Sequence, residues 1–181
     1  MNDGLIPRRY AKALYKFACE SEAQKRVYGV MCALAESFKA QPELQQVLGN
    51  PFVSVDDKVR LLNTASCAEK SDREFADFVQ LLVENRRIDM ARDIALSYLD
   101  IYRQENNIYV VRVTSAAPMT TDDEKRLKSI VERHLGAASM EYTSVVDSQL
   151  IGGFRVEVGN ELIDASISNE LKQMRFNLLS K

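Results

Sequence analysis

Apolar residues recur at helical spacing through roughly the first hundred residues of the chain. Pro7 suits the first turn of a helix, where its missing N–H has no partner in any case. Ser54 and the S-x-x-E pattern at Ser71–Glu74 are typical helix starts. Short polar connections separate the stripes, so we predict a six-helix bundle over residues 1–105. The stripes are Tyr10, Ala13, Leu14, Phe17 and Ala18; Val27, Val30, Met31, Leu34 and Phe38; Leu44, Val47 and Leu48; Val59, Leu62 and Ala65; Phe75, Phe78, Val79 and Leu82; and Ile88, Ala91, Ile94, Ala95, Tyr98, Ile101 and Tyr102.

The pattern changes near Asn106-Asn107, where β-branched residues from Ile108 to Val113 predict a strand. An acidic first turn behind Thr120 or Thr121 then predicts a helix, and a second strand follows over 140–146. Phe154, Val156 and Val158 alternate with polar residues, as in a half-buried strand. A hairpin through Gly159-Asn160 would return Leu162-Ile163 beside it, before a last helix from Ile167 to Leu179. We therefore expect a β-α-β-β-β-α domain over 106–181 and an α+β protein.

Composition and charge exclude several classes of protein. The 24 Lys and Arg residues nearly balance the 26 Asp and Glu residues, and no segment concentrates the basic ones, which argues against a nucleic-acid binder. No apolar run approaches the roughly 20 residues that span a bilayer, and the N-terminus lacks the pattern of a secretory signal. The three cysteines form no C-x-x-C pair, as expected for buried thiols in a reducing compartment. These features predict a soluble, cytoplasmic protein.

The residues that could carry chemistry have simpler structural explanations. His134 is the single histidine and lies near a predicted helix end, so no metal site is expected. A strand rather than a helix follows Gly152-Gly153, which favours a turn or bulge over a phosphate loop. Asp147 fits a turn, and Asp164 or Ser166 fits the cap of the last helix. We therefore predict no catalytic residue and no cofactor, and expect a protein that binds other proteins.

The run from Asp147 to Ile167, which reads DSQLIGGFRVEVGNELIDASI, closely resembles the signature of the ATP synthase delta subunit. In mitochondria the same family is called the oligomycin-sensitivity-conferring protein. Arg9-Tyr10-Ala11-Lys12-Ala13-Leu14 is similar to the family's opening motif, and Leu81–Ile88 to the end of its fifth helix. Asn50-Pro51, which follows the third predicted helix, also fits the pattern of the family. The resemblance therefore covers the whole chain in matching order.

This resemblance implies a peripheral-stalk protein without catalytic activity. In the family, the N-terminal helices sit on the catalytic head and contact the N-terminal helix of an alpha subunit. The C-terminal domain holds the end of the b subunit. The resemblance thus implies a protein on the cytoplasmic face of the bacterial plasma membrane, attached there through the synthase complex.

The expected contact residues combine this resemblance with the apolar pattern. We expect a groove for the helix of the alpha subunit between the first and fifth helices, with Phe75 and Val79 turned toward the core. The fifth helix has more apolar positions than one core face needs, which favours such a groove, although each of these residues could equally belong to the core. The groove residues are Tyr10, Ala13, Leu14, Phe17, Phe78, Leu81 and Leu82, and the residues of the last helix expected to touch the b subunit are Leu171, Met174, Leu178 and Leu179. The alternative for these residues of the last helix, which the pattern alone favours, is that they lie in the core of their own domain.

Three other interpretations remain open at the level of sequence. A helical adaptor unrelated to the synthase would share the same pattern of helices. A small RNA-binding protein would explain the β-α-β-β-α order, but it predicts a basic surface that the sequence lacks. An enzyme is the third of these interpretations, and any turnover abolished by His134→Ala would be its best evidence.

Overall fold

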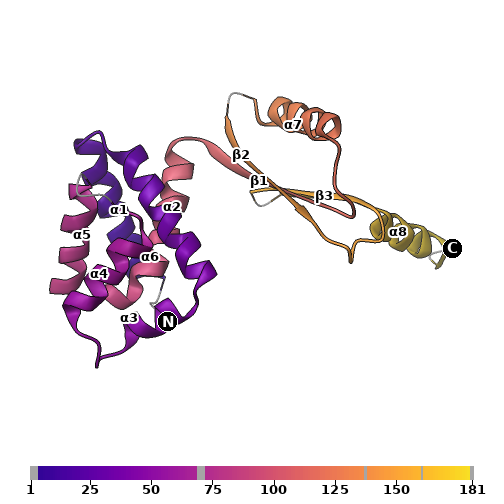
Figure 1. Ribbon diagram of the computed structural model, residues 1–181. Coiled ribbons are helices and arrows are strands. Elements are labelled where there is room, and N and C mark those ends of the chain that lie inside the picture. Colours follow the sequence, from indigo (N-terminus) through magenta and orange to yellow (C-terminus); the bar gives the residue numbers. More distant parts are fainter. Residues whose placement is uncertain (1–3, 69–71, 137, 160, 180–181) are drawn as a thin grey trace. The chain divides into compact units, whose positions relative to one another are not determined.

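The structure is a computed structural model that describes residues 4–68, 72–136, 138–159 and 161–179; of residues 177–179 it describes the helical backbone alone. The chain divides into two compact units, Met1–Glu105 and Asn106–Lys181 (Figure 1). The first unit contains helices and the second combines helices with a sheet, so the predicted α+β class is confirmed. Each unit is described by itself below.

The N-terminal unit is built from α-helices and one short 3-10 turn. The helices follow the apolar stripes of the sequence. The first turn of the helix that begins at Val55 is stabilised by a cap, because the Ser54 hydroxyl accepts a hydrogen bond from the N–H of Asp57. The sequence suggested a single helix beginning at Ile88. In the structure a 3-10 turn occupies Ile88–Met90, and the α-helix begins at Ala91. The elements are α1 (Leu5–Glu20), α2 (Gln24–Ala40), α3 (Glu43–Gly49), α4 (Val55–Ala65), α5 (Arg73–Glu84), η1 (Ile88–Met90) and α6 (Ala91–Glu105).

The core of this unit forms where α6 packs against both α1 and α2. Tyr98 of α6 is fully buried, and its hydroxyl donates a hydrogen bond of 3.3 Å to the backbone oxygen of Gln24. Its ring meets that of Tyr15 edge to face, with 6.1 Å between ring centroids. Tyr28 and Tyr102 stack at 4.1 Å. Contacts between aromatic rings therefore connect α1, α2 and α6, the three longest helices of the unit.

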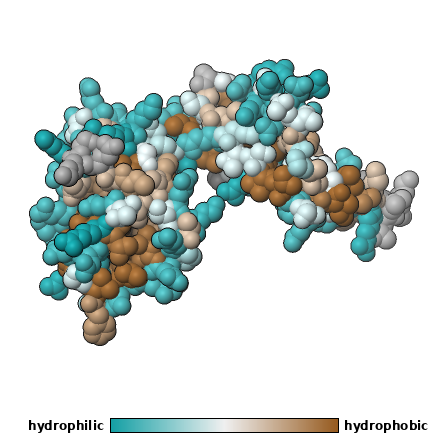
Figure 2. All heavy atoms as spheres, in the orientation of Figure 1, coloured by the Kyte–Doolittle hydropathy of each residue, from teal (hydrophilic) through white to brown (hydrophobic). Residues whose placement is uncertain are grey.

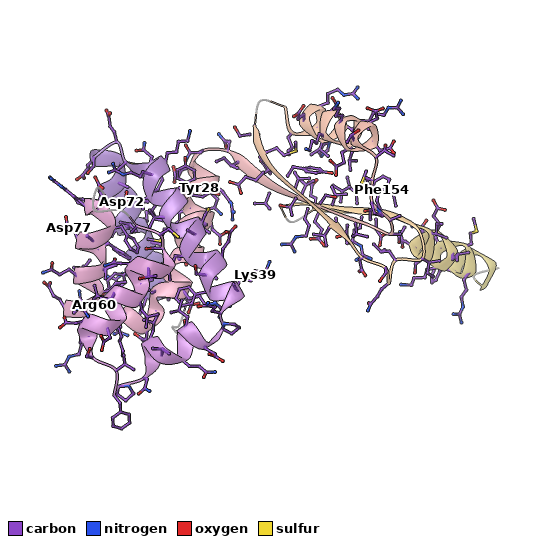
Figure 3. The ribbon with its side chains drawn as sticks, in the orientation of Figure 1. Tyr28, Lys39, Arg60, Asp72, Asp77 and Phe154 are labelled. Carbon is purple, nitrogen blue, oxygen red and sulfur yellow. The ribbon has the colours of Figure 1, made fainter. Side chains whose placement is uncertain are left out.

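The start of α5 is held by ion pairs to α2. Arg26 of α2 places its Nε 3.1 Å from Asp72 and its Nη2 2.8 Å from Glu74, next to the labelled Asp72 in Figure 3. Ser71, the first residue of the predicted capping box, lies outside the described residues, and Asp72 caps no N–H with its side chain. Hydrogen bonding to a backbone N–H and the nearby Arg26 guanidinium hold the pKa of Glu74 below its ordinary value.

The C-terminal unit is a four-stranded mixed sheet with the strand order β2-β1-β3-β4. The central β1 pairs in parallel with β2, which requires the crossover through α7, and antiparallel with β3. β3 and β4 form the predicted hairpin, with Val158 opposite Glu161; Asn160 lies outside the described residues. The elements are β1 (Ile108–Ser115), α7 (Thr121–Leu135), β2 (Ser139–Val146), β3 (Gly153–Val158), β4 (Glu161–Ser166) and α8 (Ile167–Leu179).

One face of this sheet carries the core of the unit. Val111 and Val113 of β1 and Val156 and Val158 of β3 are buried, because alternate side chains of a strand point to the same face. Leu127 and Val131 of α7 complete the cluster, and α7 begins at Thr120, whose hydroxyl accepts a hydrogen bond from the N–H of Asp123. The opposite face carries alternating charges, such as Arg112 directly across from Glu157. That face therefore carries charges of both signs and is not uniformly basic.

Candidate functional site

The seven residues predicted to form the groove for the alpha subunit divide into a buried group and an exposed group. Leu14, Phe78 and Leu82 are in the core of the N-terminal unit. Ala13 is exposed, Tyr10 is half-buried, and Phe17 and Leu81 are 42% and 41% exposed. Helix α1 contacts α5, so the exposed residues lie on two neighbouring helices. The apolar surface available to a partner is therefore narrower than the sequence pattern indicated.

Helix α8 carries the residues predicted to touch the b subunit, and none of its described side chains is buried. Leu171 is 54% exposed and Met174 is 59% exposed. The side chains of Leu178 and Leu179 lie outside the described residues, although the helix itself extends to Leu179. Figure 2 shows apolar residues at the surface along α8. Helix α7 differs sharply, because its Leu127 and Val131 pack into the core.

A network of hydrogen bonds fixes the point where β4 becomes α8. The Asp164 carboxylate accepts a hydrogen bond of 3.0 Å from the N–H of Ser166, and the Ser166 hydroxyl accepts one of 3.3 Å from the N–H of Asn169. The Asn169 side-chain amide donates in return to the Asp164 carbonyl, at 3.2 Å. Of the two cap residues that the sequence suggested, Asp164 and Ser166, it is Ser166 that caps α8, and Asp164 holds that cap in place. We call these three residues and their bonds the β4–α8 corner.

Charge strengthens the same corner. Arg155 of β3 lies opposite Asp164 in the hairpin and places its Nη2 3.2 Å from the carboxylate. Hydrogen bonds from the hydroxyl and the N–H of Ser166, together with the Arg155 guanidinium, hold the pKa of Asp164 below its ordinary value. The Asp164 carboxylate is consequently charged at neutral pH. It links β4 to Ser166, the N-cap of α8, and to Arg155 of the neighbouring β3.

The Gly152-Gly153 pair lies next to the β4–α8 corner and does not form a phosphate loop. The Gly152 carbonyl accepts a hydrogen bond of 3.1 Å from the N–H of Ile167, and Gly153 begins β3 with φ of +80°. A Cβ at Gly153 would overlap the carbonyl oxygen of Ala165, and one at Gly152 would meet the side chain of Ile167. Gly153 is therefore required by its positive φ and by the backbone of β4, whereas a Cβ at Gly152 would need only the side chain of Ile167 to shift.

Groups that could perform chemistry are scattered over the described part of the chain. Residues 4–68, 72–136, 138–159 and 161–179 hold no cluster of three His, Cys, Asp or Glu side chains suited to a metal ion. His134 lies in the last turn of α7, is largely exposed, and approaches Glu161 with 3.6 Å between Nε2 and Oε2. Cys19 and Cys67 are exposed and Cys32 is half-buried, contrary to the expectation of buried thiols. Within the same residues, every helix is too short or too polar to cross a membrane.

Several exposed apolar residues were not identified from the sequence. Phe52 is 95% exposed in the turn between α3 and α4, directly after Pro51. Ile151, Ile167 and Phe176 are exposed next to the β4–α8 corner or on α8. The signal for Ile167 was present in the sequence, since it lies four residues before Leu171 on the same face of a helix. Nothing in the local pattern distinguishes Phe52 from a core residue.

Comparisons with known proteins agree along the whole chain. The family described as "ATP synthase delta (OSCP) subunit" matches residues 6–178. The protein named ATP synthase subunit delta of Bacteroides thetaiotaomicron is 37% identical over 182 residues, which cover 100% of this chain and 97% of that protein. That of Parabacteroides distasonis is 37% identical over 179 residues, covering 99% and 98%.

A solved structure agrees in fold. A chain in the cryo-EM structure of the Toxoplasma gondii mitochondrial ATP synthase hexamer matches with a TM-score of 0.71 over 96% of this chain and 97% of that one, at 23% identity. The order of helices and strands, the signature corner and the extent of the sequence match lead to one conclusion: this chain belongs to the ATP synthase delta (OSCP) subunit family.

Proposed function

We propose that this protein is a peripheral-stalk subunit of an F-type ATP synthase, which links the catalytic head to the b subunit and catalyses no reaction itself. The observation that carries the proposal is the match of the delta-subunit family to nearly the whole chain, residues 6–178. Exposed apolar helix surfaces on each of the two units supply the separate contacts that a connector needs. The protein would reach the cytoplasmic face of the bacterial plasma membrane through these partners.

The N-terminal unit would bind the N-terminal helix of an alpha subunit along α1 and α5. Phe17 and Leu81 present large apolar side chains on these two helices, and the small side chain of Ala13 lets a partner helix approach α1 closely. An amphipathic helix typically binds in such a position, with apolar anchors spaced three or four residues apart. Leu14, Phe78 and Leu82 would support the surface from beneath, because they are buried in the core.

Isothermal titration of the full chain with a synthetic peptide from the N-terminus of the alpha subunit tests this contact. Ala13→Asp or Leu81→Asp places a charge on the surface, and loss of an anchor at the centre of an interface weakens binding by about 2 kcal/mol, or roughly 30-fold. Phe52→Asp is the control, since it also replaces an exposed apolar residue by an acid but lies in neither helix. Affinities equal to that of the control would refute the assignment.

The C-terminal unit would bind the C-terminal region of the b subunit through α8. Leu171 and Met174 are exposed and lie on one face of the helix, and the unbranched thioether of Met174 adapts easily to a partner surface. The sequence also assigns Leu178 and Leu179 to this contact. Titration with a peptide from the C-terminus of the b subunit tests it: Met174→Asp should abolish binding, whereas Phe52→Asp should leave it unchanged.

A further inference from the structure

A single arginine connects α2 to the start of α5. The Nε of Arg26 lies 3.1 Å from Oδ1 of Asp72, and its Nη2 donates a hydrogen bond of 2.8 Å to Oε2 of Glu74. The Asp72 and Glu74 side chains are only 8% and 12% exposed, whereas that of Arg26 is 49% exposed. The rigid fork of a guanidinium holds two carboxylates at once in a fixed geometry. This Arg26 bridge therefore fixes the first turn of α5 in a defined place relative to α2.

The start of α5 depends on the Arg26 bridge because it has no side-chain cap of its own. Asp72 occupies the N-cap position, but its side chain accepts no hydrogen bond from an N–H of the first turn. The preceding helix differs, since the Ser54 hydroxyl caps α4. Glu74 is charged at neutral pH, because hydrogen bonding to its own N–H and the Arg26 guanidinium lower its pKa. A contact with another helix thus takes the place of a local cap.

Packing between α4 and α5 adds less support than a closed core would. An open groove with a volume of about 270 Å³ runs between the two helices. Because solvent reaches into this groove, α4 lies less closely against α5 than it would in a continuous core. The residues of α5 that line the groove are Ala76, Val79, Gln80 and Val83, which follow directly after the Arg26 bridge. The bridge therefore acts where the packing from α4 is incomplete.

Helix α2 also holds the end of α4, through a second contact. The Ser37 hydroxyl donates a hydrogen bond of 2.7 Å to the carbonyl oxygen of Ala65. Arg26 and Ser37 are about three helical turns apart, so both side chains lie on one face of α2. The two contacts position different helices. Helix α5 carries Leu81, which belongs to the proposed surface for the alpha subunit, whereas α4 carries no residue of that surface.

We propose that Arg26 is a positioning residue for binding of the alpha subunit, because its bridge to Asp72 and Glu74 holds α5 in the place beside α1 that the partner helix requires. This inference rests on the proposed function for the identity of the partner, and adds a residue that acts through α5 from outside the binding surface. Without the bridge, the first turns of α5 open more often, and binding must order them again. Leu81 lies about two turns after Glu74 on the same helix, so a displaced first turn also changes where Leu81 meets a partner.

The test combines calorimetric titration of the full chain with the peptide from the N-terminus of the alpha subunit and amide hydrogen exchange. Arg26→Ala should weaken binding about fivefold. It should also speed exchange of the Ala76 N–H, which is bonded to the Asp72 carbonyl, by about tenfold. Ser37→Ala is the matched control, since it removes a contact between α2 and α4, and should leave both the affinity and this exchange rate unchanged.

Two further variants show whether Arg26 acts through the bridge. Arg26→Lys keeps the charge but cannot hold both carboxylates in the same geometry, so its affinity should lie between those of Arg26→Ala and the unaltered chain. Glu74→Gln should weaken binding by itself and add little in the Arg26→Ala background, because both substitutions break the same bridge. If Arg26→Ala does not fold, the comparison of Arg26→Lys and Glu74→Gln with Ser37→Ala decides the question.

The outcomes separate this inference from the proposed function. If Arg26→Ala binds the peptide as tightly as Ser37→Ala, while Leu81→Asp still weakens binding, Arg26 is not a positioning residue and the α1–α5 surface stands. A lower stability of Arg26→Ala in a urea titration, with affinity unchanged, would likewise overturn the inference, because Arg26 would then only stabilise the unit. If Leu81→Asp binds as the Phe52→Asp control does, the proposed surface and the inference both fail.

Discussion

Substitution of Gly153 by alanine should destabilise the C-terminal unit more than Gly159→Ala does. Two effects combine at Gly153. An L-residue at φ of +80° is strained by about 1–2 kcal/mol. The new Cβ would also overlap the Ala165 carbonyl and lie 3.0 Å from the Cα of Ser166, so β4 must move away from β3. Movement there weakens the hydrogen bond from the Ile167 N–H to the Gly152 carbonyl, which is worth about 1 kcal/mol.

The expected loss is therefore about 2–3 kcal/mol, and two glycines serve as controls. Gly159 has φ of +56° and only an ordinary contact for a Cβ, with Tyr109 Cδ1 at 4.0 Å, so Gly159→Ala adds backbone strain in the same unit without a clash against the backbone. Gly29 lies inside α2 with nothing within 4 Å, and alanine there should stabilise the N-terminal unit by about 0.5–1 kcal/mol, since alanine favours helix.

Chemical denaturation followed by NMR resolves the two units, because amide signals of β1 and β3 report the C-terminal unit alone. In a domain of this size, a loss of about 2–3 kcal/mol also lowers Tm by roughly 10 °C or more. If Gly153→Ala destabilises the unit by no more than Gly159→Ala does, the close approach of β4 to Gly153 does not constrain the fold, and our explanation of Gly153 is wrong.

Three further changes test the core and the corner. Phe75→Ala should destabilise the N-terminal unit by about 3–5 kcal/mol in a urea titration, because the buried ring leaves a cavity. The lowered pKa of Asp164 means that its contribution to stability is present above the ordinary aspartate pKa of 3.8 and is lost as the pH falls through the folded value; Asp164→Asn should flatten this acid limb. Burial raises the pKa of Tyr98, so stability should fall as the pH rises above 10.0. Burial also raises the pKa of Tyr142, so absorbance titration should find both phenols ionising late, and Tyr98→Phe should reduce that late phase without removing it.

The sequence predicted best what local chemistry decides. The alternation from Phe154 to Val158, the turn at Gly159 and the cap at Ser166 each depend on residues close in the chain, and the structure has them where they were expected. The strand order was not predicted, because the pairing of β1 with both β2 and β3 depends on contacts across the whole unit. Local patterns do not encode which strand lies next to which.

The exposed faces of helices were harder to predict than the helices themselves. Helix α5 has apolar residues on more than one face, and periodicity alone does not state which face meets the core. Packing decided that Phe78 and Leu82 are buried and that Leu81 is exposed. For α8 the helical spacing of Leu171 and Met174 was in the sequence, but only the structure shows that both side chains are exposed.

The central position of β1 has a mechanical consequence. The chain passes from α6 through Asn106 and Asn107 directly into β1, so tension between the two units enters the sheet at Ile108. β1 is bonded to β2 along Ile108–Ser115 on one side and to β3 along Val111–Ser115 on the other. A pull along the strand therefore loads both ladders in shear, and their hydrogen bonds share the force instead of opening one after another.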